Sequence, residues 1–200
     1  RWEFTRPLKE QNMEEQLTAA FARIPLLCRE TAQGIPWGAA LETLRVWEYT
    51  GRVRRGYFIE GLSGAQFVRE ADFAGTMLAL EQPQEQLIWL SAADPAQPWG
   101  KYLPHMQERS FMNIPGTAVA LKTGIPVAVL ERQGQILRVF EEDCLSEALK
   151  ALDTAFTKGR IYASLKRITI KQYPENACSA LEAAGSFLRQ MQEYVLYRGY

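Results

Sequence analysis

Proline and glycine residues divide the first eighty residues of this chain into short segments, and this punctuation limits what the chain can fold into. Pro25 and Gly34 each end a stretch of helical character, and Gly51 ends a third. Proline lacks the N–H that a continuing helix needs, and glycine is the usual residue just beyond a helix end. A small domain of short helices and strands is therefore expected.

Apolar spacing predicts a helix over residues 10–22, a short helix or turn over 26–32, and a third helix that begins at Pro36. Proline suits a first helical turn, because its missing N–H has no partner there. The third helix carries an apolar stripe that we expect to be buried, formed by Trp37, Ala40, Leu41, Leu44 and Trp47.

Two extended runs follow, over residues 52–60 and 65–69, and the turn-forming residues 61–64 separate them. Three short helices before a two-stranded ribbon are the outline of a winged helix. One more helix is expected over 73–80, and Pro83 marks a boundary. Residues 1–82 are therefore assigned to a winged-helix-like module.

Residues 83–200 have a different character. Strands are expected over 86–91, 117–122, 126–131, 135–140, 166–171 and 194–198, with a long loop over 92–115 and a helix over 175–184. A further helix, capped by Asp143 and ended by Lys158-Gly159, should bury Leu145, Ala148, Leu149, Leu152 and Phe156. The whole chain is predicted to be α+β: a winged-helix-like module followed by a mostly antiparallel, barrel-like β domain with flanking helices.

The sequence lacks the motifs of an ATPase. Its only Gly-Lys pair, Gly100-Lys101, is followed by Tyr102 where a phosphate-binding loop needs Ser or Thr, and Pro95 replaces the first glycine. No acidic motor tetrad is present. We therefore expect this chain to bind no ATP by itself.

Other catalytic sites are also not indicated. His105 is the only histidine and has no nucleophile elbow beside it. The three cysteines are too far apart to suggest a zinc site or a disulfide framework. No apolar run is long enough to span a membrane. We expect no catalytic or metal-binding residue, and a cytoplasmic protein. The chain starts at Arg1, without Met and in a run of strand character over residues 1–4, so we expect a piece of a longer protein.

The densest candidate site combines arginines with aromatic side chains: Arg45, Arg52, Arg54, Arg55, Tyr57 and Phe58. Strand alternation would place Arg52 and Arg54 on one face and Arg55 and Tyr57 on the other. Guanidinium groups suit phosphates, and aromatic rings stack on unpaired bases. Alternatively, the arginines pair with Glu42, Glu48 and Glu60 or with a neighbouring domain. Basic and acidic residues number 23 each, so nucleic-acid binding by this chain alone should be weak.

A second candidate lies in the loop over residues 92–115. Trp99 and Tyr102, on either side of Lys101, offer stacking surfaces for a nucleotide. The same rings can instead pack the loop onto the sheet. The turn chemistry of the surrounding prolines and glycines favours this structural role.

Residues 51–67 (GRVRRGYFIEGLSGAQF) resemble the region downstream of the motor in Lhr-type (large helicase-related) superfamily 2 helicases, called DEAD/H-associated. Residues 93–100, 115–119 and 129–134 agree with the same pattern. The positions that match include Arg54, Arg55, Tyr57, Phe58, Gln66 and Phe67, with Asp94, Pro95, Trp99 and Gly100 from the loop. The resemblance thereby adds Gln66 to the candidate nucleic-acid contacts.

The resemblance implies an accessory part of an ATP-dependent helicase that moves 3′ to 5′ along a single strand. ATP and magnesium would belong to the parent protein, and the partners would be single-stranded DNA or RNA and the motor domains of the same chain. Two alternatives stay open. The piece braces the motor without touching nucleic acid, or it resembles a DNA glycosylase, which needs a carboxylate or amide in a base-sized pocket.

Overall fold

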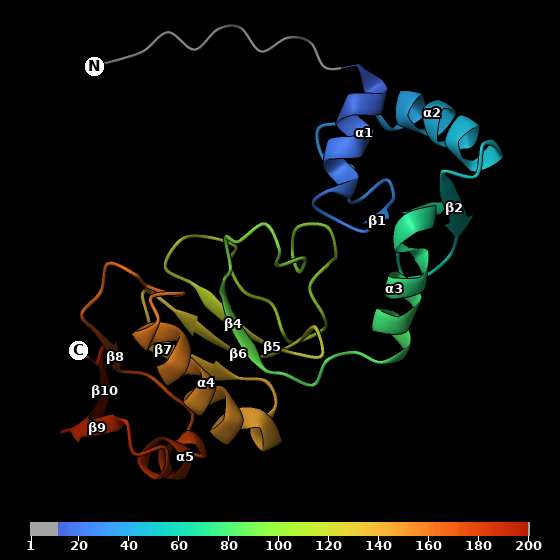
Figure 1. The fold of residues 1–200 in the computed structure, drawn as a ribbon. Helices are drawn as coiled ribbons and strands as arrows, with labels where there is room; N and C mark the ends of the chain where they lie inside the picture. The colour runs from blue at the N-terminus through green and yellow to red at the C-terminus, as the bar shows by residue number, and fades with distance from the viewer. Residues whose placement is uncertain (1–11, 200) are drawn as a thin grey trace, which may run out of the picture. The chain divides into compact units, whose positions relative to one another are not determined.

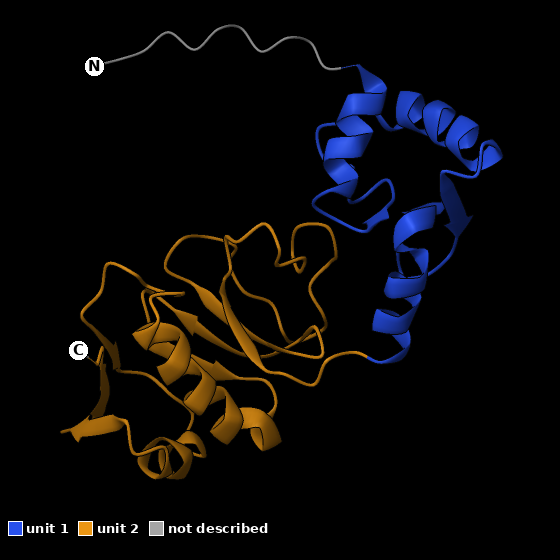
Figure 2. Cartoon of the chain, viewed as in Figure 1, with its two compact units in different colours: residues 1–82 blue, residues 83–200 orange. Residues whose placement is uncertain are grey.

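The computed structural model describes residues 12–199 and divides the chain into two compact units, residues 1–82 and residues 83–200 (Figure 2). The strand expected over residues 1–4 lies outside the described residues. Each unit combines helices with antiparallel strands around a hydrophobic core of its own (Figure 1). The predicted α+β class is confirmed.

The first unit places two helices and a short strand before the two-stranded ribbon, which is one helix fewer than the predicted winged-helix outline. Its elements are α1 (Met13–Phe21), β1 (Leu26–Leu27), α2 (Trp37–Tyr49), β2 (Val53–Gly56), β3 (Gln66–Arg69) and α3 (Glu70–Glu81). The three strands form one antiparallel sheet in the order β1-β3-β2. The wing is the loop of residues 57–65, which joins β2 to β3.

Local chemistry explains where the helices of this unit begin and what they bury. The Glu15 N–H donates to the Asn12 side chain at 2.8 Å, and the Asn12 N–H donates to the Glu15 carboxylate at 3.1 Å. This capping box starts α1 later than apolar spacing alone predicts. Of the predicted stripe on α2, Ala40, Leu44 and Trp47 are buried, and its other two members are partly buried.

Residues 26–32, for which a short helix or turn was expected, do not form a helix. Leu26 and Leu27 form a strand that pairs with Val68 and Phe67 of β3, and only the following residues form a turn. Two strand residues are too few to show a periodicity, and their partners lie far along the chain. The extended run predicted over 52–60 is shorter than expected, because the chain leaves the sheet for the wing after Gly56.

The second unit contains two open antiparallel sheets. The first is a meander of β4 (Ile88–Ser91), β5 (Ala118–Lys122), β6 (Ile125–Glu131) and β7 (Ile136–Val139), paired in that order. The second, in the order β8-β10-β9, consists of β8 (Arg167–Ile170), β9 (Phe187–Gln190) and β10 (Glu193–Tyr197). The helices are η1 (Glu142–Cys144), α4 (Leu145–Thr157) and α5 (Ala177–Ala183).

Helix α4 packs on the meander, and all five of its predicted buried residues are buried. The Trp89 indole N–H of β4 donates to the Ala148 carbonyl of α4 at 2.8 Å. A smaller core cluster joins Val119 and Val129 of the meander to Ala92 and Phe111 of the long loop. The meander is thus positioned by a helix and by an ordered loop.

Three details of the second unit differ from the predictions. Asp143 lies within η1 and does not cap α4. Strand β9 was not predicted, because only Phe187 of its four residues is buried and no alternation results. Within the described residues β4 and β7 do not pair, so the meander does not close into a barrel.

Candidate nucleic-acid interface

The arginines beside the wing are paired with carboxylates of their own chain. Arg54 donates two hydrogen bonds to Glu70 at the start of α3, both at 2.6 Å, and its guanidinium carbon lies 4.3 Å from the centre of the Phe73 ring. These hydrogen bonds raise the pKa of Arg54 and lower the pKa of Glu70. Arg54 is therefore held by α3 through both charge and stacking.

Arg52 and Arg55 have looser ion pairs. Arg52 lies over the Trp47 ring at 3.9 Å and contacts Glu14 at 3.4 Å. Arg55 contacts Glu48 of α2 at 3.3 Å. About half of each arginine side chain stays exposed, and ion pairs this exposed contribute only about 0–1 kcal/mol. A phosphate can therefore compete for both guanidinium groups.

The prediction that Arg52 and Arg54 lie on the same strand face is wrong. Arg52 contacts α1 and α2, whereas Arg54 contacts α3. Alternation applies only inside a strand, and Arg52 precedes β2. Its backbone N–H still donates to the Trp47 carbonyl at 2.7 Å at the end of α2. Arg52 therefore takes its direction from the helix end and not from the strand.

Arg45 differs from the other arginines. It is exposed on α2, and no ion pair within residues 12–199 involves it. One helical turn further on, Tyr49 is 94% exposed, and Tyr57 at the start of the wing is 81% exposed. We call Arg45, Tyr49, Arg55 and Tyr57 the α2–wing surface. Tyr49 was missed by sequence reasoning, although its spacing of four from Arg45 places both on one helix face.

Two of the predicted contact residues serve the wing itself. The Gln66 side chain is completely buried; its oxygen accepts hydrogen bonds from the Phe58 and Ile59 N–H groups, and its nitrogen donates to the Ile59 carbonyl, all at 2.8 Å. Phe58 packs edge-on against Phe73 at 6.0 Å between ring centres. Gln66 is therefore a structural residue and is not accessible to a nucleic acid.

In the second unit, the loop over residues 92–115 is held by its own side chains. The Trp99 indole N–H donates to the Gly124 carbonyl at 2.8 Å, and the Lys101 ammonium donates to the Asp94 carbonyl at 2.5 Å. Burial lowers the pKa of Lys101. Tyr102 is partly buried. These contacts are those expected if the side chains of this loop pack it onto the sheet and do not stack on a nucleotide.

A cavity of about 260 Å³ also lies in the second unit. Its walls include Ser91, Thr117, Gln133, Tyr162 and Ser164. The Tyr162 hydroxyl lies 3.0 Å from the Leu130 carbonyl and 3.2 Å from the Gly116 carbonyl, and burial raises the pKa of Tyr162. The cavity thus offers an amide and hydroxyl groups, with no carboxylate among the described residues that line it.

Residues 6–86 match the family model of the winged-helix domain of large helicase-related protein. This match spans α1 to α3 and the wing, the same elements that carry the arginines. Residues 6–86 belong to the Lhr winged-helix family. The Lhr-type helicase region inferred from residues 51–67 is thereby confirmed.

Two Lhr proteins extend the similarity into the second unit. The Lhr helicase/probable uracil glycosylase of Mycolicibacterium smegmatis is 35% identical in an alignment of 146 residues, and the match covers 65% of this chain. The Lhr helicase/uracil glycosylase of Escherichia coli is 33% identical in an alignment of 140 residues, and the match covers 64% of this chain. The matched region covers 9% of the length of each relative. Among the described residues of this Lhr-type region, none of the helices combines the length and the apolar character that a membrane span requires.

Proposed function

We propose that this chain is an accessory module of an ATP-dependent helicase and that its α2–wing surface contacts single-stranded DNA or RNA. The observation that carries the proposal is the exposure of Tyr49, 94%, one helical turn from Arg45, which has no ion-pair partner in the described residues; Tyr57 at the start of the wing is also 81% exposed. Aromatic rings this exposed lack the burial that normally stabilises them, and they are available to stack on bases.

The arginines divide into two groups on this proposal. Arg45 has no ion-pair partner within residues 12–199, and Arg52 and Arg55 are each held by one exposed ion pair, so these three can bind phosphate. Arg54 is held by two short hydrogen bonds and an aromatic ring, so its charge is already satisfied. The wing arginines therefore do not act as one uniform cationic stripe.

The test measures binding of the chain to a labelled single-stranded oligonucleotide over a range of salt concentrations. The Arg45→Ala/Arg55→Ala double variant should bind more weakly for every sequence. The slope of log affinity against log salt should fall by about 0.7 for each phosphate that the variant no longer binds. Arg54→Ala is the matched control and should leave the slope unchanged. An unaltered slope in the double variant would exclude the α2–wing surface.

The parent helicase would supply what this module lacks. ATP and magnesium would bind to its motor domains, which are the proposed partners within the same polypeptide, and the module would act during 3′ to 5′ translocation and unwinding. A cytoplasmic location accords with that role. The test is to compare unwinding by the parent helicase with and without the Arg45→Ala/Arg55→Ala change.

Helix α3 favours a second candidate function, a brace for the motor. None of its residues is buried, although it carries Leu78 and Leu80, which are 55% and 45% exposed. An exposed apolar helix of this kind is a contact surface for another part of a protein. Leu78→Gln/Leu80→Gln should lower ATPase activity of the parent without changing oligonucleotide binding by this chain. Unchanged ATPase activity would exclude the brace.

A glycosylase role is favoured by the names of the two relatives and by the Gln133-lined cavity, which has the amide that base recognition needs. No carboxylate among the described lining residues is available to assist hydrolysis, so this candidate ranks below the others. Incubation of the chain with uracil-containing single-stranded DNA, with release of free uracil as the readout, tests it.

A further inference from the structure

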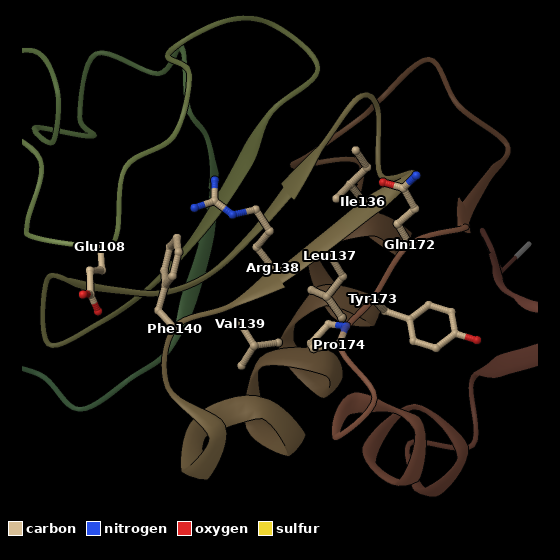
Figure 3. A pocket seen from close by; sticks show the side chains of 9 residues that line it. All are labelled: Glu108, Ile136, Leu137, Arg138, Val139, Phe140, Gln172, Tyr173 and Pro174. Atoms are coloured by element: carbon tan, nitrogen blue, oxygen red, sulfur yellow. The ribbon is translucent and has the colours of Figure 1, made fainter.

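A groove of about 440 Å³ runs along the outer edge of β7 in the second unit (Figure 3). β7 is the last strand of the meander, so only one of its edges is paired with β6. The beginning of the other edge is covered. The Gln172 N–H donates to the Gln135 carbonyl at 3.1 Å, and the Leu137 N–H donates to the Gln172 carbonyl at 2.8 Å.

This short parallel ladder ends at Pro174. In a longer ladder the residue two positions after Gln172 would donate to the Leu137 carbonyl and accept from the Val139 N–H. Proline has no N–H to donate, and its carbonyl accepts from the Ala177 N–H at 2.9 Å instead. Within residues 12–199 neither the Leu137 carbonyl nor the Val139 N–H has a hydrogen-bond partner, and both residues line the groove.

The register of β7 shows that both groups point outward. The Phe140 N–H donates to the Val127 carbonyl of β6 at 2.8 Å, and the Leu137 N–H points the other way, to Gln172. Backbone groups alternate between the two edges of an antiparallel strand, so the Val139 N–H shares the outer edge with Leu137. The groove therefore offers the Leu137 carbonyl as an acceptor and, two residues on, the Val139 N–H as a donor with the Val139 carbonyl beside it.

An acceptor beside a donor matches the edge of a nucleobase. The amino group and ring nitrogen of adenine or cytosine present the complementary donor and acceptor, and unpaired bases are recognised on these edges by proteins. Phe140 and the exposed part of Arg138, whose guanidinium carbon lies 5.3 Å from the Phe140 ring centre, add a stacking surface. This run of three open backbone groups on Leu137 and Val139 suits a single base better than an added peptide strand, which pairs over several residues.

We propose that the β7 edge groove binds one unstacked base of the single strand. The inference rests on the proposed contact with single-stranded nucleic acid and places a second contact in the other unit. The Gln172 side chain, exposed and without a hydrogen bond in the described residues, would donate to or accept from the same base.

The test follows backbone amide signals of the full chain by NMR while a single-stranded oligodeoxyadenylate is added. The Val139 amide signal should shift, and an oligonucleotide of the same length with abasic sites should leave it in place. Pro174→Ala restores an N–H that can bond the Leu137 carbonyl and close the ladder, so it should weaken binding about tenfold. Pro83→Ala, outside both sheets, is the matched control and should bind as the unchanged chain does.

A second variant tests the groove without changing the backbone hydrogen bonds of the β7 edge. Gln172→Ala keeps the backbone pairing and should weaken binding severalfold; unchanged affinity would contradict the proposal. If the Val139 signal stays in place while those of Tyr49 and Tyr57 shift, the groove is excluded and the α2–wing surface stands. If an extended peptide shifts the Val139 signal and the oligonucleotide does not, the groove is a peptide site and the proposal is overturned.

Discussion

At the scale of single residues, hydrogen bonding separates structural side chains from available ones. Gln66 has the residue type of a nucleic-acid contact, yet its amide oxygen and nitrogen are both engaged by Phe58 and Ile59. Tyr57, two residues before Ile59, has no hydrogen bond in the described residues and is exposed. Residue type and position in the sequence favour both residues equally, and only burial distinguishes them.

The first prediction concerns Gln66. Gln66→Leu should lower the free energy of unfolding by about 2–3 kcal/mol, because two partly buried N–H groups and one carbonyl lose their partner. Urea denaturation followed by circular dichroism measures this. Tyr57→Ala is the control, with a change below about 0.5 kcal/mol. Equal stabilities of the Gln66→Leu and unchanged chains would refute the structural role.

The second prediction concerns Glu30, whose carboxylate accepts hydrogen bonds from the Ser63 N–H at 3.0 Å and from the Ser63 hydroxyl. Burial tends to raise the pKa of Glu30, but these hydrogen bonds outweigh it and hold the pKa at about 2, below the ordinary 4.5. A lowered pKa stabilises the fold above the unfolded-state value, and that stability is lost as the pH falls toward 2.

The wing of the unchanged chain should therefore lose stability between about pH 4.5 and 2. Glu30→Gln should remove this part of the pH dependence and lower stability at pH 7. Thermal unfolding midpoints across that pH range provide the measurement. A parallel pH dependence in the variant would show that Glu30 does not hold the wing.

At the scale of elements, periodicity predicts α2 and α4 well, since each buries a stripe of side chains spaced for one helix face. It fails for β1 and β9. β1 has two residues, and β9 is an edge strand with one buried side chain. Such strands form because they pair with other strands. The residues of those partner strands lie outside the local sequence pattern.

The third prediction tests the contribution of α4. Leu152→Ala should lower the free energy of unfolding of the second unit by about 2–5 kcal/mol, because Leu152 is completely buried in the main core. Leu78→Ala, on the exposed α3, is the comparison and should have a much smaller effect. Both values come from urea denaturation of the full chain.

At the scale of the whole molecule, the chain consists of two units with separate cores. The main core of the second unit takes residues from both of its sheets and from α4 and α5. A unit with a complete core of its own can fold alone.

The fourth prediction follows from this. Residues 83–200 produced alone should give a cooperative thermal transition and dispersed amide NMR signals. A control fragment that ends at residue 160, and so lacks the second sheet, should not. Absence of a cooperative transition in residues 83–200 would show that this unit needs the winged helix.

The sequence by itself determined the fold class, the helices with regular apolar stripes, the winged helix and the Lhr resemblance carried by residues 51–67. These properties depend on local spacing, turn chemistry and motif residues, all of which are present in a linear string. Only the tertiary structure decided which arginines are paired, that Gln66 is buried, and that Pro174 leaves two backbone groups of β7 open. Those outcomes depend on residues that are distant in sequence and adjacent in space, because charge pairing and hydrogen bonding act over a few ångströms whatever the separation along the chain.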